Sequence, residues 1–353
     1  MKRDKYAEKM NTRFNLLPTG IGSLPYVNAQ EACKHVLKNF AEIPFWPQLP
    51  KLGFCENMYV QFAYDLPGIV VDYDKKKIFA DLEKKLGLEI DSFYRKISES
   101  ALTYDKEYFA GFYAMQKKKE LLKVAKALKG HITGPASLGL QITDSQSGKA
   151  LLYNEFYRDI IIKALNEKAK LQERLLGALN KNVIIFCDEP SLCMFGTPYL
   201  SLSREEIVNA LADVFKGVNC LKGVHCCGNT DWSLLLKLPI DIISFDAYNY
   251  GERLALYSKE LKEFIARGGV LAIGIVPSVE ENFNRESLET LALKFESLLK
   301  IFVRKGLYQK EVLSFSLLTP SCGLAGMSTK SAEKALKMTK ELSRILRKRY
   351  ALE

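Results

Sequence analysis

Three residues that stand at the ends of two apolar segments could together bind one metal ion: His225, Cys227 and Cys322. On an extended strand, side chains two residues apart point to the same face, so His225 and Cys227 would share a face and Cys226 would point away. Cys322 closes a later apolar segment and is followed by Gly323. One imidazole nitrogen and two thiolates are a donor set typical of zinc, with a fourth position left for a carboxylate or a substrate.

Asp246 stands near the end of an apolar segment that lies between the segments of Cys227 and Cys322, and it is a candidate fourth ligand. It could equally orient another ligand or contact a substrate. Zinc stabilises the thiolate form of a bound thiol at neutral pH, although the pKa of a free thiol is ~8–9. Because zinc hydrolases usually have ligands rich in histidine and carboxylate, this donor set favours alkyl transfer to a thiol over hydrolysis. The non-catalytic alternative is a zinc ion closed by four protein ligands.

The sequence alternates short apolar segments with long amphipathic ones, and this alternation predicts the strands and helices that position these residues. Each apolar segment is too short for a helix and mostly continuous, which is typical of strands buried on both faces of a parallel sheet. We expect helices over 147–180, 203–219, 284–305 and 329–348, the second of which begins with a capping box at Ser203. The apolar segments are 16–22, 130–135, 182–190, 221–227, 241–247, 269–277 and 311–322.

Strands that alternate with helices predict an α/β fold, and a series of at least seven strands favours a (β/α)8 TIM barrel in which residues 1–353 form one domain. No G-x-G-x-x-G follows the first strand, which disfavours a dinucleotide-binding sheet. Residues 26–128 are less regular and contain Pro47, Pro50 and Pro67. We expect them to form an irregular, partly helical insertion after the first strand, over the barrel mouth, where the strand ends of such barrels carry function.

The composition excludes several classes of protein. No segment approaches the ~18 uninterrupted apolar residues of a membrane helix, and the N-terminus lacks the apolar part of a secretory signal, so we expect a cytoplasmic protein without membrane contact. The formal net charge is +10, but the lysines are spread over many helical segments, so we expect no nucleic-acid partner. In an intracellular chain of this length, the eight cysteines suggest core thiols and metal ligands rather than disulfides.

Short motifs at the predicted strand ends occur in a recognisable order. They are GIGSLP (20–25), ITGP (132–135), FCDEPSL (186–192), VHCCGNT (224–230), IISFD (242–246) and PSCGLAG (320–326). Over residues 19–340 this set resembles the single catalytic barrel of cobalamin-independent methionine synthases, within the uroporphyrinogen decarboxylase and corrinoid methyltransferase superfamily. His-Cys-Cys-Gly-Asn-Thr is also similar to a motif of coenzyme M methyltransferases. Pro-Ser-Cys-Gly stands where Pro-Asp-Cys-Gly is more usual.

The resemblance implies a zinc-dependent methyltransferase that converts homocysteine to methionine. Its zinc ligands would be His225, Cys227 and Cys322, and the family's fourth ligand, a glutamate, falls on Asp246. The Asp188-Glu189-Pro190 motif favours an amino-acid thiol, because coenzyme M has no amine. A second carboxylate for the amino group would come from the insertion. The substrate-binding candidates are Ile21, Gly22, Ser23, Glu56, Asp188 and Glu189.

The expected methyl donor is a methylcorrinoid such as methylcobalamin, carried by a corrinoid protein, with methyl-folate less favoured. The family's histidine that protonates the folate amine should lie in GVLAIGIVP (269–277), which contains none. A methylcorrinoid needs no such protonation, because cobalt leaves as a stabilised low-valent species. The alternatives are a methyltransferase acting on coenzyme M or another thiol, a uroporphyrinogen decarboxylase-like enzyme, and a non-catalytic zinc-binding protein. A decarboxylase would hold its substrate carboxylates with an arginine-rich segment near the N-terminus, and the segment after GIGSLP lacks that arrangement.

Overall fold

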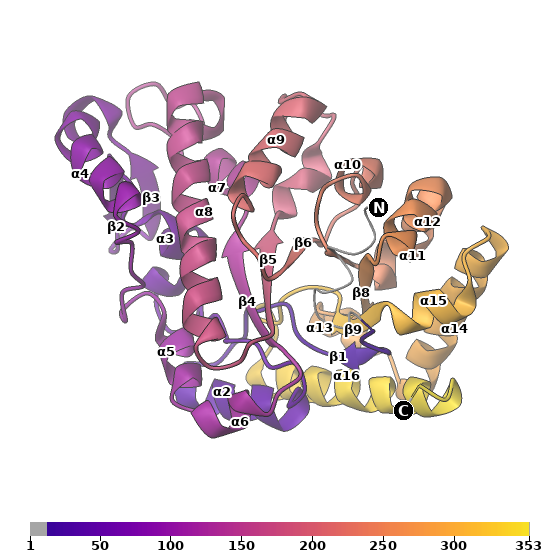
Figure 1. Ribbon diagram of the computed structural model, residues 1–353. Coiled ribbons are helices and arrows are strands. Elements are labelled where there is room, and N and C mark those ends of the chain that lie inside the picture. The colour runs from indigo at the N-terminus through magenta and orange to yellow at the C-terminus, as the bar shows by residue number, and fades with distance from the viewer. Residues whose placement is uncertain (1–12, 353) are drawn as a thin grey trace.

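The computed structural model describes residues 13–352 and shows a curled parallel sheet surrounded by helices (Figure 1). The sheet has seven strands in the order β1-β9-β8-β7-β6-β5-β4. Each apolar segment of the sequence overlaps one of these strands, so the prediction of an α/β fold built on parallel strands is confirmed. The strands are β1 (Leu17–Pro18), β4 (Leu128–Thr133), β5 (Val183–Asp188), β6 (Leu221–Cys226), β7 (Ile242–Phe245), β8 (Val270–Val276) and β9 (Ser316–Pro320).

The expected closed barrel of eight strands is only partly formed in the described residues. Between β1 and β4, the place of an eighth strand is taken by an extended segment, residues 44–48, which makes only isolated bridges to Lys129 and Ser23. The Lys129 amide donates to the Pro44 carbonyl (2.9 Å), and the Gln48 amide donates to Gly22 (3.1 Å). This segment contains Pro44 and Pro47, which have no N–H group, so it cannot form a continuous hydrogen-bond ladder.

Amphipathic helices lie on the outer face of the sheet and include the four predicted ones. The predicted capping box is present, because the Ser203 hydroxyl accepts from the Glu206 amide and the Glu206 carboxylate accepts from the Ser203 amide. The helices that follow β4 to β9 are α7 (Pro135–Gln141), α8 (Glu155–Gly177), α9 (Arg204–Val214), α10 (Trp232–Leu236), α11 (Ala247–Leu254), α12 (Ser258–Ala266), α13 (Glu280–Phe283), α14 (Leu288–Arg304), α15 (Gln309–Ser314) and α16 (Thr329–Arg349), with short η3 (Leu151–Tyr153), η4 (Pro190–Met194) and η5 (Ala255–Tyr257).

Two apolar cores lie on opposite sides of the sheet. Along β5, Ile184 and Phe186 belong to a small core inside the curl, whereas Ile185 and Cys187 belong to the large core under the outer helices. Because side chains alternate between the two faces, Asp188 continues the inner row beyond the apolar core. The inner face is therefore apolar at the start of the strands and polar at their carboxyl ends.

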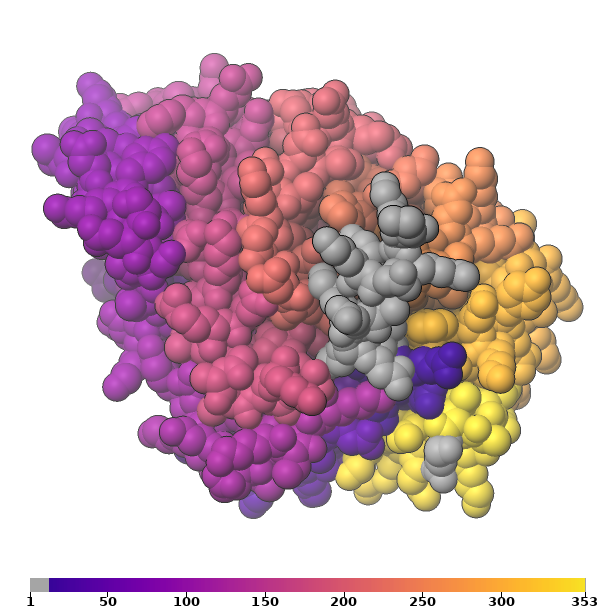
Figure 2. Space-filling view, in the orientation of Figure 1, coloured from indigo at the N-terminus to yellow at the C-terminus, as the bar shows by residue number. Residues whose placement is uncertain are grey.

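Residues 26–128 form several short elements rather than one subdomain. Helix α3 lies against β4 and α7, next to the carboxyl end of the sheet, whereas α2 packs against α5 and α16. Figures 1 and 2 show the earliest described residues, in indigo, beside the yellow C-terminal helix α16. That this region covers the barrel mouth stays a prediction. Its elements are α2 (Ala29–Asn39), η1 (Phe54–Glu56), α3 (Met58–Ala63), the antiparallel pair β2 (Ile69–Asp72) and β3 (Lys77–Ala80), η2 (Leu82–Leu86), α4 (Gly87–Ser98), α5 (Ala110–Gln116) and α6 (Lys119–Lys123). No helix within residues 13–352 is long and apolar enough to cross a membrane.

Candidate metal centre

The fold brings together the three residues that the sequence singled out as metal ligands. His225 lies in β6, Cys227 directly follows that strand, and Cys322 lies two residues beyond β9. One ligand atom from each lies within 4.8 Å of the other two. Cys226 points the other way, into the outer apolar core, as the alternation of the strand predicted. The three side chains therefore converge at the carboxyl ends of the strands, on the inner face of the sheet.

The His225 imidazole is oriented for binding through one of its nitrogens. Its Nδ1 lies 2.9 Å from the Ser244 hydroxyl, and Ser244 is its neighbour in register on β7. Its Nε2 is buried and has no hydrogen-bond partner among the described residues. An unpaired polar group at such a place costs about 1–3 kcal/mol. The free nitrogen therefore fits a metal ion, with Ser244 holding the ring from behind.

The thiols of Cys227 and Cys322 lie close enough to shift each other's pKa in opposite directions. The hydrogen bond with Cys322 and the contacts with His225 lower the pKa of the Cys227 thiol below its usual range despite its burial. The contact with Cys227 and burial raise the pKa of Cys322 well above its usual range. A bound cation would favour the thiolate form of both cysteines. An imidazole nitrogen with two such sulfurs fits zinc.

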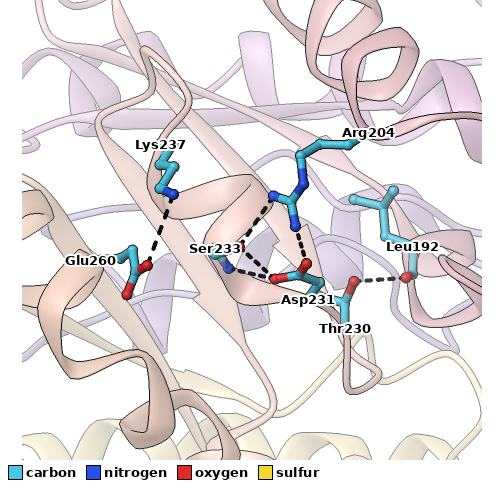
Figure 3. A network of polar contacts seen from close by, with 7 residues as sticks. All are labelled: Leu192, Arg204, Thr230, Asp231, Ser233, Lys237 and Glu260. Carbon is cyan, nitrogen blue, oxygen red and sulfur yellow. Dashed lines mark hydrogen bonds and ion pairs between the residues drawn. The ribbon is translucent and has the colours of Figure 1, made fainter.

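The loop after Cys227 is anchored by a polar network on the outer side of the sheet (Figure 3). The Thr230 hydroxyl donates to the Leu192 carbonyl of η4 (2.7 Å). Asp231 caps the start of α10 and forms an ion pair with Arg204 of α9. Cys227 is therefore fixed between a strand on one side and a loop held by two neighbouring elements on the other.

The segment that carries Cys322 is also tethered. The Ser321 hydroxyl accepts from the Ser278 amide (3.1 Å) and lies 2.9 Å from the Ser278 hydroxyl. A Cβ on Gly323 would lie 2.0 Å from the Ser23 hydroxyl oxygen, so glycine is needed for Ser23 to approach so closely. The Leu324 amide donates to the Ser23 carbonyl (2.8 Å). The predicted substrate residue Ser23 thus lies beside the segment of the candidate metal ligand Cys322.

Asp246 is not part of the three-ligand group. It is the N-cap of α11, and its Oδ1 accepts from the Asn249 amide (2.9 Å). Its Oδ2 accepts from the Asn249 side chain (2.6 Å). Both carboxylate oxygens are therefore engaged in starting a helix, a role that an N-terminal aspartate commonly has. The structure favours the second role considered for this residue, a neighbour of the ligands rather than a ligand.

Asp188 and Glu189 have different environments although they are adjacent. Asp188 pairs in register with His225, and its Oδ1 is buried without a partner among the described residues. The Glu189 carboxylate accepts from the amides of Ala136 and Ser137 (both 2.9 Å), at the start of α7. Burial raises the pKa of Glu189 to about 7. Asp188 therefore keeps one unpaired carboxylate oxygen, whereas the Glu189 carboxylate is occupied by amides of α7.

Glu56 is likewise occupied elsewhere. It is fully buried and accepts from the Ala110 amide (2.6 Å) and from the Gln61 side chain (2.9 Å). Burial raises the pKa of its carboxyl group to about 7. Its hydrogen bonds join elements of the 26–128 region to one another, and the structure does not bring it into the metal group.

Two polar residues of β4 were not singled out by the sequence. The Lys129 ammonium donates to the Ile21 carbonyl (2.5 Å) and lies 4.3 Å from the centre of the Phe186 ring. The His131 ring lies so close to Gly22 that a Cβ there would be 2.8 Å from its Cε1. The predicted substrate residues Ile21 and Gly22 thus rest on β4. In the sequence, these two residues could have been recognised because polar side chains occupy every second position of the apolar strand β4.

Comparisons with known proteins concern the fold. No protein-family model and no curated protein sequence matches the chain. A B12-independent methionine synthase from Shewanella sp. W3-18-1, solved in complex with selenomethionine, has 18% sequence identity and a TM-score of 0.59, over 96% of this chain and 100% of that one. A putative vitamin-B12 independent methionine synthase from Listeria monocytogenes has 15% identity and a TM-score of 0.54, over 90% of this chain and 85% of that one.

Proposed function

We propose that the protein is a zinc-dependent methyltransferase that transfers a methyl group to the thiol of homocysteine. The observation that carries the proposal is the convergence of His225, Cys227 and Cys322, with the buried Nε2 of His225 left unpaired. The two similar structures, one of a methionine synthase and one of a putative methionine synthase, support the same activity. No fourth protein ligand belongs to the group among the described residues, which favours an open position over a closed structural site.

The chain's own residues would divide the work around the acceptor thiol. When bound, zinc supplies a Lewis acid that keeps a thiol ionised near neutral pH. Ser244 orients His225, and the Ser23 hydroxyl lies beside the Cys322 segment, where it can contact the acceptor. The unpaired carboxylate oxygen of Asp188 suits an ammonium group, so an amino-acid thiol is preferred over coenzyme M.

The proposed donor is a methylcorrinoid, free or on a corrinoid protein. Val270, Ala272 and Gly274 alternate along β8, so the strand offers no proton donor to a folate amine at these positions. Both similar structures are nevertheless described as B12-independent, so the test must distinguish a methylcorrinoid donor from methyl-folate.

The test combines metal content with methyl transfer. Purified protein is assayed with methylcobalamin or methyl-tetrahydrofolate as donor, and with homocysteine or coenzyme M as acceptor. We expect one zinc per chain and methionine formed from methylcobalamin. Cys322→Ser should lose zinc and turnover together, whereas Cys226→Ser, whose side chain lies in the outer core, should keep both. Turnover that survives removal of the metal would overturn the proposal, and turnover from the folate alone would overturn the donor.

A further inference from the structure

A cavity of about 640 Å³ lies between the end of α2 and the later turns of α16, which pack against each other (Figure 1). Ala41 and Glu42 in its wall directly precede the extended segment 44–48, which runs parallel to the strands. The cavity therefore lies at the amino-terminal end of the sheet, whereas the candidate metal ligands lie at the carboxyl end. Its volume falls within the roughly 300–1,000 Å³ that is usual for small-molecule sites.

Positive side chains outnumber negative ones in the wall of this cavity. Five lysines and arginines line it, against three glutamates. Because like charges gathered in a concave surface attract a ligand of the opposite sign, the cavity favours an anion. The five cations are Lys38, Lys337, Lys340, Arg344 and Arg347.

The cation of Lys340 covers the end of α2. Its ammonium donates to the Lys38 carbonyl (2.9 Å), near the carboxyl end of that helix. The partial negative charge of a helix end would otherwise disfavour an anion at this place. The side chains of Lys38 and Arg344 form no hydrogen bond or ion pair with the described residues. Both charges are therefore free to attract a ligand.

Arg347 is only weakly paired, although its side chain is no more than 23% exposed. Its Nε is buried and has no hydrogen-bond partner within residues 13–352. Its Nη1 lies 3.7 Å from the Glu42 carboxylate, which is too far for a hydrogen bond. Arg344 stands three residues earlier on α16, and residues at this spacing are neighbours on a helix surface. Two guanidinium groups thus meet at the same wall of the cavity.

A third cation lies near Glu42 and adds to the excess of positive charge. The Lys126 amide donates to the Glu42 carbonyl (2.8 Å), and its ammonium donates to the Arg13 carbonyl (2.8 Å). Burial lowers the pKa of Lys126, the Glu42 carboxylate raises it, and the charge of Arg347 lowers it again. One carboxylate therefore serves two cations that repel each other, and a bound anion would reduce this repulsion.

We propose that the cavity between α2 and α16 binds a small ligand through a phosphate group, which Arg344 and Arg347 hold while Lys38 and Lys340 add charge. A phosphate monoester carries between one and two negative charges near neutral pH and has three acceptor oxygens, so it suits several cations better than a carboxylate does. The planar guanidinium group matches its oxygens in a forked hydrogen bond. The site is separate from the metal centre, so either assignment can fail without the other.

The test measures binding to the purified full-length protein by calorimetry at about 150 mM salt, where weak surface attraction is screened. The probes are inorganic phosphate, ribose 5-phosphate and adenosine monophosphate, with ribose and succinate as controls that lack phosphate. We expect at least one phosphate probe to bind about tenfold or more tightly than either control. Equal binding of the three phosphates would support a site for the phosphate group alone, and tighter binding of one ester would support a sugar phosphate or a nucleotide.

Four variants locate the site. Arg344→Gln and Arg347→Gln should each weaken binding of the phosphate probe by about tenfold or more. Arg95→Gln removes the same charge from the last turn of α4, outside the cavity, and should change binding by less than about twofold. Glu42→Gln removes the carboxylate that competes for Arg347 and should tighten binding, a gain that a damaged fold would not produce.

Three results would overturn the proposal. One is a wild-type protein that binds succinate as tightly as the phosphates, or binds none of the probes. Another is an equal loss of affinity in Arg95→Gln and in the two cavity variants, which would indicate attraction by overall charge. The third is full affinity in both Arg344→Gln and Arg347→Gln, which would place the phosphate elsewhere on the molecule.

Discussion

The candidate ligand His225 has one hydrogen-bond partner for its ring, the Ser244 hydroxyl. Ser244 occupies the Nδ1 of His225, so only Nε2 is free toward the cysteines. Removal of such a supporting hydrogen bond typically lowers metal affinity by about 10-fold to 100-fold. Ser244→Ala should therefore bind zinc at least tenfold more weakly in a chelator competition, with an unchanged fold by circular dichroism. Ser98→Ala, on the surface of α4, is the matched control, and equal zinc affinities for the two variants would argue against the orienting role.

Substitution of Asp246 tests whether the chain supplies a fourth metal ligand. Both of its oxygens bind Asn249, so we expect Asp246→Asn to keep its full zinc content and an unchanged absorption spectrum with cobalt in place of zinc. Asp246→Ala should in addition lower the free energy of unfolding by about 1 kcal/mol, because α11 loses its cap. Loss of zinc from the asparagine variant, to the extent seen for Cys322→Ser, would show instead that Asp246 is a fourth ligand.

At the scale of elements, the loops after β6 and β9 hold the two cysteines in place. Thr230→Val removes the hydroxyl that donates to the buried Leu192 carbonyl, and this should lower the free energy of unfolding by about 1–2 kcal/mol. It should also speed release of zinc to a chelator, because the loop after Cys227 loses one of its anchors. Thr197→Val is the matched control, since its hydroxyl donates to Met194 on the exposed surface. Equal effects of the two changes on zinc release would contradict the anchoring role.

The elements also explain which part of the barrel departs from regular form. The segment 44–48 lies where an eighth strand would, and its prolines limit it to isolated bridges. The same segment provides Trp46, on which His131 stacks, and Gln48, which bonds to Gly22. The irregular strand thus supports the inner polar face even though it does not close the ladder.

For the molecule as a whole, buried carboxyl groups predict how stability changes with pH. The pKa of Glu56 is raised to about 7 in the folded state, above its ordinary value of 4.5, so the folded chain binds this proton more tightly than the unfolded chain. Its contribution is present in full below about pH 4.5 and is lost as the pH rises through about 7. The measurement is the free energy of unfolding in urea at pH 5 and at pH 8. We expect its fall between these pH values to be smaller in Glu56→Gln than in the wild type, by roughly 1–3 kcal/mol. Glu263→Gln, on the exposed side of α12, should follow the wild type, and parallel curves for all three proteins would contradict the prediction.

Much of the molecule could be predicted because its signals are local. Short apolar segments predicted the seven strands of the parallel sheet, and the H-x-C spacing predicted that His225 and Cys227 share one face. The occupied carboxylates could not be recognised in this way. The Glu189 carboxylate accepts from backbone amides more than fifty residues earlier in the chain, and the Glu56 carboxylate accepts from the backbone amide of Ala110. Such partners depend on how α7 and the 26–128 region pack, and no spacing along the chain records that packing.

By itself, the sequence predicted the series of parallel strands, the polar character of their carboxyl ends and the three candidate sulfur and nitrogen ligands that the fold brings together. Periodicity is sufficient for these features, since a strand's alternation decides which side chains share a face. Only the tertiary structure decided which carboxylates are free. Asp246 caps α11, Glu189 accepts from amides at the start of α7, and Glu56 joins helices of the 26–128 region. Asp188 and His131 instead keep unpaired polar atoms. The reason is that hydrogen-bond satisfaction depends on neighbours in space, and those neighbours exist only once the sheet has curled.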